Sequence, residues 1–265
     1  MSDYYLRVDK PKVFESKRNL SLSKQVFLLG TEINLSTPPI LYKYFKLGND
    51  GENDFTNRIL DTITEGALWF STKRYLNDPC EMSYVNVAAN SFPPPDPRVS
   101  FSIEPLSKKV AENFNKCRIT CFSENWNIGP MWANYSGGQN GICIGFETKN
   151  LVDCFFPVIY ESKVNKEFLS GEQGLLNAFS LKDESWSYEA EWRLIYPWNP
   201  LRIKENSNND GLLQSLNLSI KEIVFGNQVN SDIKNLIMNN HLKKENCEIF
   251  ETTINSKIER KSLTK

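Results

Sequence analysis

The segment WSYEAEWRLIY, residues 186–196, carries the pattern that most strongly constrains the fold. In an extended chain, alternate side chains lie on opposite faces of the strand, about 6.5–7 Å apart along each face. The apolar face of this strand would hold Trp192, Leu194 and Tyr196. The other face would hold Glu189, Glu191 and Arg193. We therefore predict a strand that packs one face on the core and presents two carboxylates and a guanidinium on the other.

Two interpretations of this polar face stay open. It could belong to an edge strand whose charged side chains are solvated and form weak surface ion pairs. Alternatively, the nearby aromatic residues exclude water from the charges, as the sequence places Trp186, Tyr188, Trp192 and Trp198 around them. A carboxylate between aromatic walls can stabilise a positive charge that develops on a sugar ring, as in glycosyl transfer.

The rest of the chain alternates short strands with short helices. We expect strands at 40–47, 67–72, 118–123, 141–147, 157–160, 191–196, 220–226 and 247–254. We expect helices at 54–66, 107–116, 130–135, 174–181 and 231–243, and a proline-rich surface loop at 91–97. This order predicts an α+β fold with mixed, largely antiparallel sheets and interspersed short helices, rather than a doubly wound parallel sheet.

The expected domain organisation is simple. Residues 40–253 would form a single α+β domain, and residues 1–39 an N-terminal extension packed on it. Residues 254–265 would form a basic C-terminal tail that is frayed.

Composition excludes several classes of function. The 265 residues include 31 Lys and Arg against 32 Asp and Glu, so no strong positive field attracts nucleic acid or anionic lipid. The single histidine, His241, excludes His-rich metal sites, and its place near a helix end suits the helix dipole. Neither a membrane span nor the apolar segment of a signal peptide is present, so we expect a cytoplasmic protein whose six cysteines are thiols.

The segment LNDPCE, residues 76–81, has a structural and a functional interpretation. Asp78, Pro79 and Glu81 fit a capping box at the start of a helix. In a functional interpretation, Asn77 and Asp78 also stand at the lip of a cleft, where a strand gives way to a helix. The two interpretations are compatible.

The segment CFSENWNIGPMWANYSGGQNGICIGF, residues 121–146, offers further candidates. Pro130 would start a short helix that places Trp132 and Tyr135 on one face, where aromatic pairs serve cores more often than ligand sites. Its glycines match neither the dinucleotide-binding fingerprint nor the P-loop. Ser123 ends a strand without a nearby histidine, which argues against a hydrolase triad.

Taken in order, these segments resemble a bacterial family known as domain of unknown function 2971. The resemblance covers residues 40–228 and rests on NDP-x-E, CFS, MW-x-x-Y, G-x-C-I-G-F and W-x-YE-x-EWR. The chain departs from the family pattern with Cys80 in place of an aromatic residue and with Asn134 where a histidine is common.

The order of elements also resembles the ADP-ribosyltransferase fold, particularly the branch of nucleic-acid-modifying toxins. This resemblance implies that Glu191, with Glu189 and Arg193 beside it, is the catalytic glutamate that holds the ribose 2′-hydroxyl of NAD. NAD would be a substrate, and no metal is implied. The implied NAD-binding residues are Tyr42, Lys43 and Tyr44 of the first strand, Asn77 and Asp78 at the cleft, and Ser123, Trp132 and Tyr135 around the nicotinamide.

The leading expectation is an ADP-ribosyltransferase-like enzyme, a toxin or an antiphage defence effector. It would act on a nucleic-acid or protein acceptor, with an antitoxin or regulatory protein as a further partner and without membrane association. One alternative is a metal-dependent nuclease that holds Mg²⁺ through Asp78, Glu81, Glu189 and Glu191. The other is a non-catalytic binding module whose polar strand face docks a partner.

Overall fold

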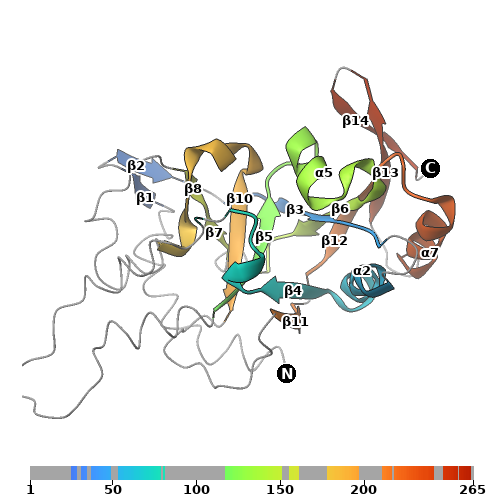
Figure 1. Ribbon diagram of the computed structural model, residues 1–265, viewed down its shortest axis with the longest axis horizontal. Coiled ribbons are helices and arrows are strands. Elements are labelled where there is room, and N and C mark those ends of the chain that lie inside the picture. The colour runs from blue at the N-terminus through green and yellow to red at the C-terminus, as the bar shows by residue number, and fades with distance from the viewer. Residues whose placement is uncertain are drawn as a thin grey trace, which may run out of the picture.

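A ten-stranded sheet forms the centre of the molecule (Figure 1). The computed structural model describes residues 25–28, 31–34, 37–48, 53–78, 80, 117–150, 155–160, 178–196, 211–216, 218–241, 247–255 and 257–263. The strands of the large sheet are β3 (Ile40–Phe45), β4 (Ala67–Ser71), β5 (Arg118–Ser123), β6 (Ile142–Glu147), β7 (Phe156–Pro157), β10 (Glu191–Tyr196), β11 (Gly211–Ser215), β12 (Ile220–Phe225), β13 (Glu248–Ile254) and β14 (Ile258–Ser262).

The pairing within this sheet is largely antiparallel. The main path runs β11-β4-β5-β3-β6-β12-β13-β14, and β10 pairs with β5 and β7. Among the described pairs of this sheet, β12 with β13 is the parallel one. Two small sheets join β1 (Gln25–Leu28) to β2 (Thr31–Asn34) and β8 (Ile159–Tyr160) to β9 (Leu181–Lys182). The expected α+β class with mostly antiparallel strands is confirmed.

Helices cover both faces of the middle of the sheet. They are α2 (Asn53–Glu65), α5 (Gly129–Tyr135) and α7 (Ser231–His241), with the 3₁₀ helices η1 (Lys73–Tyr75), η2 (Gly138–Asn140) and η5 (Glu184–Glu189). Alternate residues of β6 enter different clusters: Ile142 and Ile144 pack with α2 and α7, whereas Cys143 packs with Trp132 of α5. Because both faces are covered, β6 is apolar almost throughout and shows no alternation of polar residues.

The sheet splits beside β5, and this split positions the candidate site. One edge of β5 pairs along its whole length with β10. The other edge pairs with β3 at Tyr42–Ser123 and with β4 at Ser71–Ile119. Residues 120–122 of β5 therefore face a gap between β3 and β4.

Two expectations about the strands are wrong. Residues 184–189 form η5 and Ala190 has a left-handed backbone with φ of 43°, so β10 begins at Glu191 and Glu189 is not on it. Residues 258–262, expected as part of a frayed tail, form β14, which pairs antiparallel with β13 along its length. An ion pair between Arg260 of β14 and Glu222 links this strand to β12.

Several other expectations meet the structure only in part. The helices expected at 54–66 and 130–135 are confirmed as α2 and α5, and α7 lies where the helix at 231–243 was expected. The expected helix at 107–116, the loop at 91–97, Glu81, Trp198 and residues 1–24 lie outside the described residues. Among the helices of the described part, none is long and apolar enough to cross a membrane.

Candidate functional site

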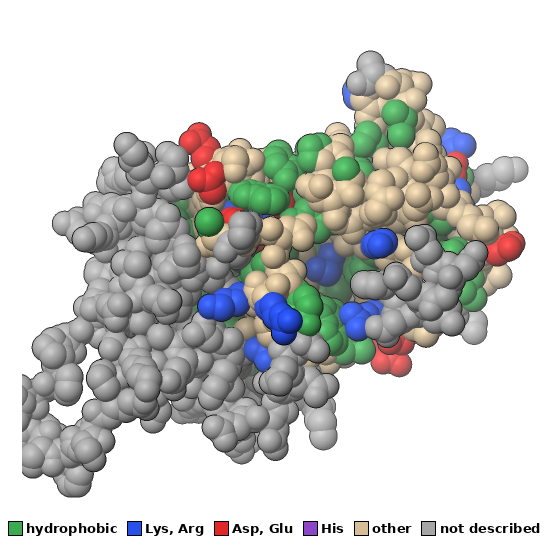
Figure 2. Space-filling model, in the orientation of Figure 1, with side chains coloured by type: hydrophobic (Ala, Val, Ile, Leu, Met, Phe, Trp, Pro, Cys, Tyr) green, Lys and Arg blue, Asp and Glu red, His purple; other side chains and the backbone are tan. Residues whose placement is uncertain are grey.

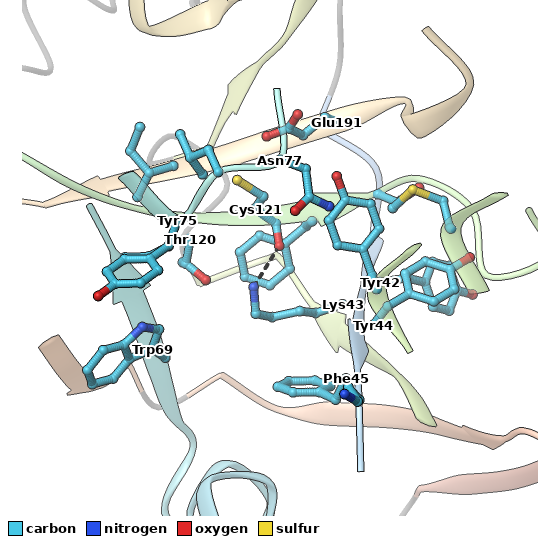
Figure 3. Close-up of a pocket in the computed structure, with 18 of the residues that line it drawn as sticks. Tyr42, Lys43, Tyr44, Phe45, Trp69, Tyr75, Asn77, Thr120, Cys121 and Glu191 are labelled. Carbon is cyan, nitrogen blue, oxygen red and sulfur yellow. Dashed lines mark hydrogen bonds between the residues drawn. The ribbon is translucent and has the colours of Figure 1, made fainter. Parts of the chain in front are cut away.

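A cavity of about 290 Å³ occupies the gap between β3 and β4. Figure 2 shows this hollow near the middle of one face, with Lys and Arg side chains around it. Residues 119–123 of β5 contribute to its lining, with aromatic side chains from both sides of the gap (Figure 3). These aromatic residues are Tyr42, Tyr44, Phe45, Trp69, Tyr75 and Tyr135.

Most of the candidate residues from the sequence meet at this cavity. Those that line it are Tyr42, Lys43, Tyr44, Asn77, Ser123, Tyr135, Glu189 and Glu191. Strand register explains part of this convergence, because Ser123 pairs with Tyr42 on one side and with Glu191 on the other. Three candidates that are far apart in the sequence thus form one row across the sheet.

Arg193, Asp78 and Trp132 are not among the residues that line the cavity. The Asp78 carboxylate accepts a hydrogen bond from the Cys80 backbone N–H at 2.8 Å, which fixes the local turn. The Trp132 side chain is buried, donates its indole N–H to the Trp126 carbonyl at 2.7 Å and packs edge-on against Tyr44. For Trp132 the core interpretation is therefore the one that its contacts support.

A buried ionic network lies at one end of the cavity. The Lys182 ammonium contacts Glu189 Oε2 at 2.5 Å and Glu191 Oε2 at 2.9 Å. Arg193 Nε donates to Glu191 Oε1 at 2.7 Å. The four residues are only 0–5% exposed, so this is not the solvated strand face of the simpler interpretation.

Two members of the network, Glu189 and Arg193, are also held from a second direction. The Tyr135 hydroxyl donates to Glu189 Oε1 at 2.6 Å, and Arg193 also donates to the Phe179 carbonyl. The Ser123 hydroxyl donates to the Glu189 carbonyl at 2.6 Å and accepts from the Asn125 N–H. Ser123 therefore fixes the turn between η5 and β10 rather than presenting a nucleophile.

The two carboxylates differ in their protonation chemistry. Burial raises the pKa of Glu189, and the contacts with Lys182 and Tyr135 offset this only in part. Burial also acts to raise the pKa of Glu191, but Arg193 and Lys182 outweigh it and hold that pKa well below its usual range. Glu191 is thus firmly ionised, whereas Glu189 is the carboxylate closer to accepting a proton.

The carboxylates also differ in their capacity to bind a ligand. An ionised carboxylate offers about four acceptor positions. Glu191 receives two hydrogen bonds from Arg193, one from Lys182 and one from the Cys121 thiol. Glu189 receives one bond each from Tyr135 and Lys182, so it keeps positions with which to bind a molecule in the cavity.

Lys43 projects into the gap itself (Figure 3). Its ammonium donates to the Cys121 carbonyl at 3.0 Å, a strand carbonyl that faces the split in the sheet. Burial lowers the pKa of Lys43, although Cys121 and Glu191 act in the opposite direction. The adjacent Thr120 hydroxyl is buried and has no hydrogen-bond partner among the described residues.

Basic and aromatic side chains surround the mouth of the cavity. Lys46 and Arg58 line it, and the Arg58 guanidinium lies over the Trp69 ring, 4.4 Å from its centroid. Tyr75 also lines the cavity; it is 52% exposed, and the Arg74 guanidinium lies 5.9 Å from the centroid of its ring. This combination suits a ligand with both aromatic and phosphate groups.

Sequence reasoning missed Lys182. Nothing in the segment LKDESWSYEAEWR marks this lysine as part of a site. The only available signal was charge balance, because two buried carboxylates and one arginine require a further cation. Charge balance did not point to Lys182, because the burial of Glu189 depends on the left-handed turn at Ala190, which the sequence does not show.

The residues of the nuclease alternative do not assemble in the described part of the chain. Glu81 lies outside it, and Asp78 does not line the cavity that holds Glu189 and Glu191. The Lys182 ammonium occupies the position between these two carboxylates. No group of three or more His, Cys, Asp or Glu among the described residues is placed to hold a metal ion.

Comparison with protein-family models, with curated proteins and with solved structures finds no match to this chain.

Proposed function

We propose that this protein is an NAD-dependent ADP-ribosyltransferase-like enzyme, built on a fold of that type, that modifies a nucleic-acid or protein acceptor. The observation that carries the proposal is the convergence of Tyr42, Ser123, Tyr135, Glu189 and Glu191 on one cavity. The cavity lies at the end of β10, where Glu191 stands next to the paired strand β5.

The size of the cavity fits one end of the dinucleotide. Small-molecule sites commonly enclose about 300–1,000 Å³, and this cavity is close to the lower bound. The nicotinamide riboside end would enter between the aromatic walls. The diphosphate would lie at the mouth, where Lys46 and Arg58 supply positive charge.

Glu189 is the carboxylate that would contact the ribose in this proposal. It keeps free acceptor positions, with which it would hold the ribose 2′-hydroxyl. Glu191, whose acceptor positions are filled, would act as a positioning residue through Lys182. This assignment exchanges the roles that the resemblance implies for the two glutamates.

The proposed reaction follows from charge development. The C1′–N bond breaks, nicotinamide leaves with the bonding electrons, and the ribose carries a positive charge until the acceptor attacks C1′ and loses its proton. A carboxylate in a cavity of low dielectric stabilises that charge more than it would in water. The buried Thr120 hydroxyl gives the bound ligand a further polar partner.

The test is transfer from NAD labelled in its ADP-ribose part to the DNA, RNA and protein of a cell extract. Wild-type protein should label one of these classes, and Glu189→Gln should reduce labelling by about 10²-fold or more, as for loss of an electrostatic contact to a transition state. Glu251→Gln is the matched control, because Glu251 is also ion-paired but lies outside the cavity. Equal labelling by wild type and Glu189→Gln would contradict the assignment.

A further inference from the structure

We infer that Lys43 is a reactive amine, placed to form an imine with an aldehyde that carries a phosphate group. This activity goes beyond the proposed transfer reaction and does not depend on NAD cleavage. It follows from the place of Lys43 in the split of the sheet, from its contacts and from the chemistry of the cavity mouth.

The position of Lys43 places its amine at the cavity. Lys43 lies on β3, and its side chain enters the cavity and reaches the Cys121 carbonyl of β5. The aromatic rings of Phe122 and Phe45 lie 5.5 and 6.0 Å from its nitrogen. The nitrogen is thus held in one place, at a wall shared with the space that a ligand would fill (Figure 3).

The surroundings of the Lys43 amine favour its neutral form. Within the described part of the chain, no carboxylate lies within 4 Å of the Lys43 nitrogen, in contrast to Lys182 with its two. The groups that favour the charged form are Cys121 of β5 and Glu191 of β10, and burial outweighs both, which lowers the pKa of Lys43. A larger share of this amine is therefore neutral, and hence nucleophilic, than of an exposed lysine at the same pH.

The cavity around Lys43 suits an aldehyde that carries a phosphate group. Lys46 and Arg58 line the same cavity and can hold a phosphate at its mouth, while the aromatic walls receive the rest of the molecule. The neutral Lys43 nitrogen attacks the carbonyl carbon. The carbonyl oxygen then leaves as water with two protons from the amine, which leaves a C=N bond to Lys43.

The experiment uses the full chain without NAD and pyridoxal 5′-phosphate as the probe aldehyde. Borohydride reduces the imine, and peptide mass spectrometry measures the labelling rate at each lysine at pH 7. Lys43 should be labelled several-fold faster than the exposed Lys149 and Lys257, because its position in the cavity and its lowered pKa leave more of this amine neutral and within reach of a bound aldehyde. Pyridoxal, which lacks the phosphate, should label Lys43 several-fold more slowly but Lys257 at a similar rate.

The labelling rates of the wild-type protein alone test whether Lys43 is a reactive amine. Labelling of Lys43 no faster than that of Lys149 and Lys257 would mean that Lys43 only caps the Cys121 carbonyl, and would overturn the inference. Equal rates with the two probes would overturn the phosphate requirement. Lys43→Met, with Lys257→Met as control, confirms the labelled position, and NAD transfer is scored separately so that either activity can fail alone.

Discussion

At the scale of single residues, the opposite pKa shifts of Glu189 and Glu191 separate two roles that the sequence could not distinguish. Glu-Ala-Glu reads as two equivalent carboxylates on one strand face. The turn at Ala190 instead brings Glu189 toward Tyr135 and leaves Glu191 between two cations. Burial dominates for Glu189, and charge pairing dominates for Glu191.

This difference predicts how much the free energy of unfolding falls when each glutamate is replaced by glutamine. Glu191→Gln should lower the free energy of unfolding at pH 7 by about 3 kcal/mol or more, since it leaves Arg193 and Lys182 short of a buried partner. Glu189→Gln should lower the free energy of unfolding clearly less, because burial in the folded state already disfavours the charged form of Glu189. Urea denaturation of both variants measures the two losses of unfolding free energy. A larger loss for Glu189→Gln than for Glu191→Gln would contradict the prediction.

The pH dependence of stability follows from the same shift. A folded-state pKa below the unfolded value makes the ionised Glu191 a source of stability above about pH 4.3, the ordinary value for glutamate. That stability is lost as the pH falls below this value toward the folded pKa. The difference in unfolding free energy between wild type and Glu191→Gln should therefore shrink between pH 6 and pH 3. A difference that stays constant over this range would contradict the assigned direction of the shift.

Lys182 should couple the two carboxylates energetically. Lys182→Met removes the shared cation and should destabilise the protein by about 3–5 kcal/mol. In the double variant Lys182→Met with Glu189→Gln the loss should be smaller than the sum of the single losses, as for residues in one network. Lys257→Met, at a side chain that is 76% exposed, is the control and should change little. Additive losses would mean that Lys182 and Glu189 act independently.

At the scale of elements, the strand β14 shows where composition misleads. The composition of NSKIERKSLTK is typical of a solvated basic tail. Whether it forms a strand depends on a partner strand, which the sequence does not identify. In the structure, the Arg260 guanidinium pairs with Glu222 and lies over the rings of Phe250 and Trp126. The Tyr42 hydroxyl also donates to Glu222, at 3.0 Å, so β14 is linked to a wall of the cavity.

Arg260→Met should therefore destabilise the protein by about 1–2 kcal/mol, between the usual values for exposed and for buried ion pairs. Calorimetric melting measures the loss. Lys261→Met is the matched control on the same strand, because Lys261 is 58% exposed and Glu251, its partner, keeps Lys234. A melting temperature for Arg260→Met equal to that of the control would show that β14 is not anchored through this contact.

The turn between α5 and β6 depends on a glycine for steric reasons. A Cβ at Gly141 would lie 2.3 Å from the Phe45 carbonyl oxygen and 2.4 Å from that of Ser136, both backbone atoms. Gly141→Ala should cost about 1–3 kcal/mol, as for an overpacked core position. Gly129→Ala, where no heavy atom lies within 4 Å, is the control. A stable Gly141→Ala protein would mean that this turn can shift away from β3.

At the scale of the whole molecule, the sequence could predict the α+β class, most strands of the sheet and the apolar face of β10. Most of the site residues that it could nominate do line the cavity, because aromatic and charged residues gather in the same segments. It could not predict the split between β3 and β4, since that depends on two isolated pairing points, Tyr42–Ser123 and Ser71–Ile119. The cavity, and with it the setting of Lys43, is a product of this tertiary arrangement.

Positive and negative charges nearly balance over the whole chain, and they also balance within the buried ionic network. The network of Lys182, Arg193, Glu189 and Glu191 has balanced charges when both carboxylates are ionised. Recognition of an anionic ligand would therefore depend on the cations at the cavity mouth, Lys46 and Arg58, rather than on the overall field.

Release of nicotinamide from NAD by the purified protein and acceptor-containing extract measures the proposed bond cleavage directly. We expect release by wild type and by Glu251→Gln, and a loss of about 10²-fold or more in Glu189→Gln at a temperature at which that variant stays folded. Release that is undetectable in wild type, or that persists in Glu189→Gln, would contradict this expectation.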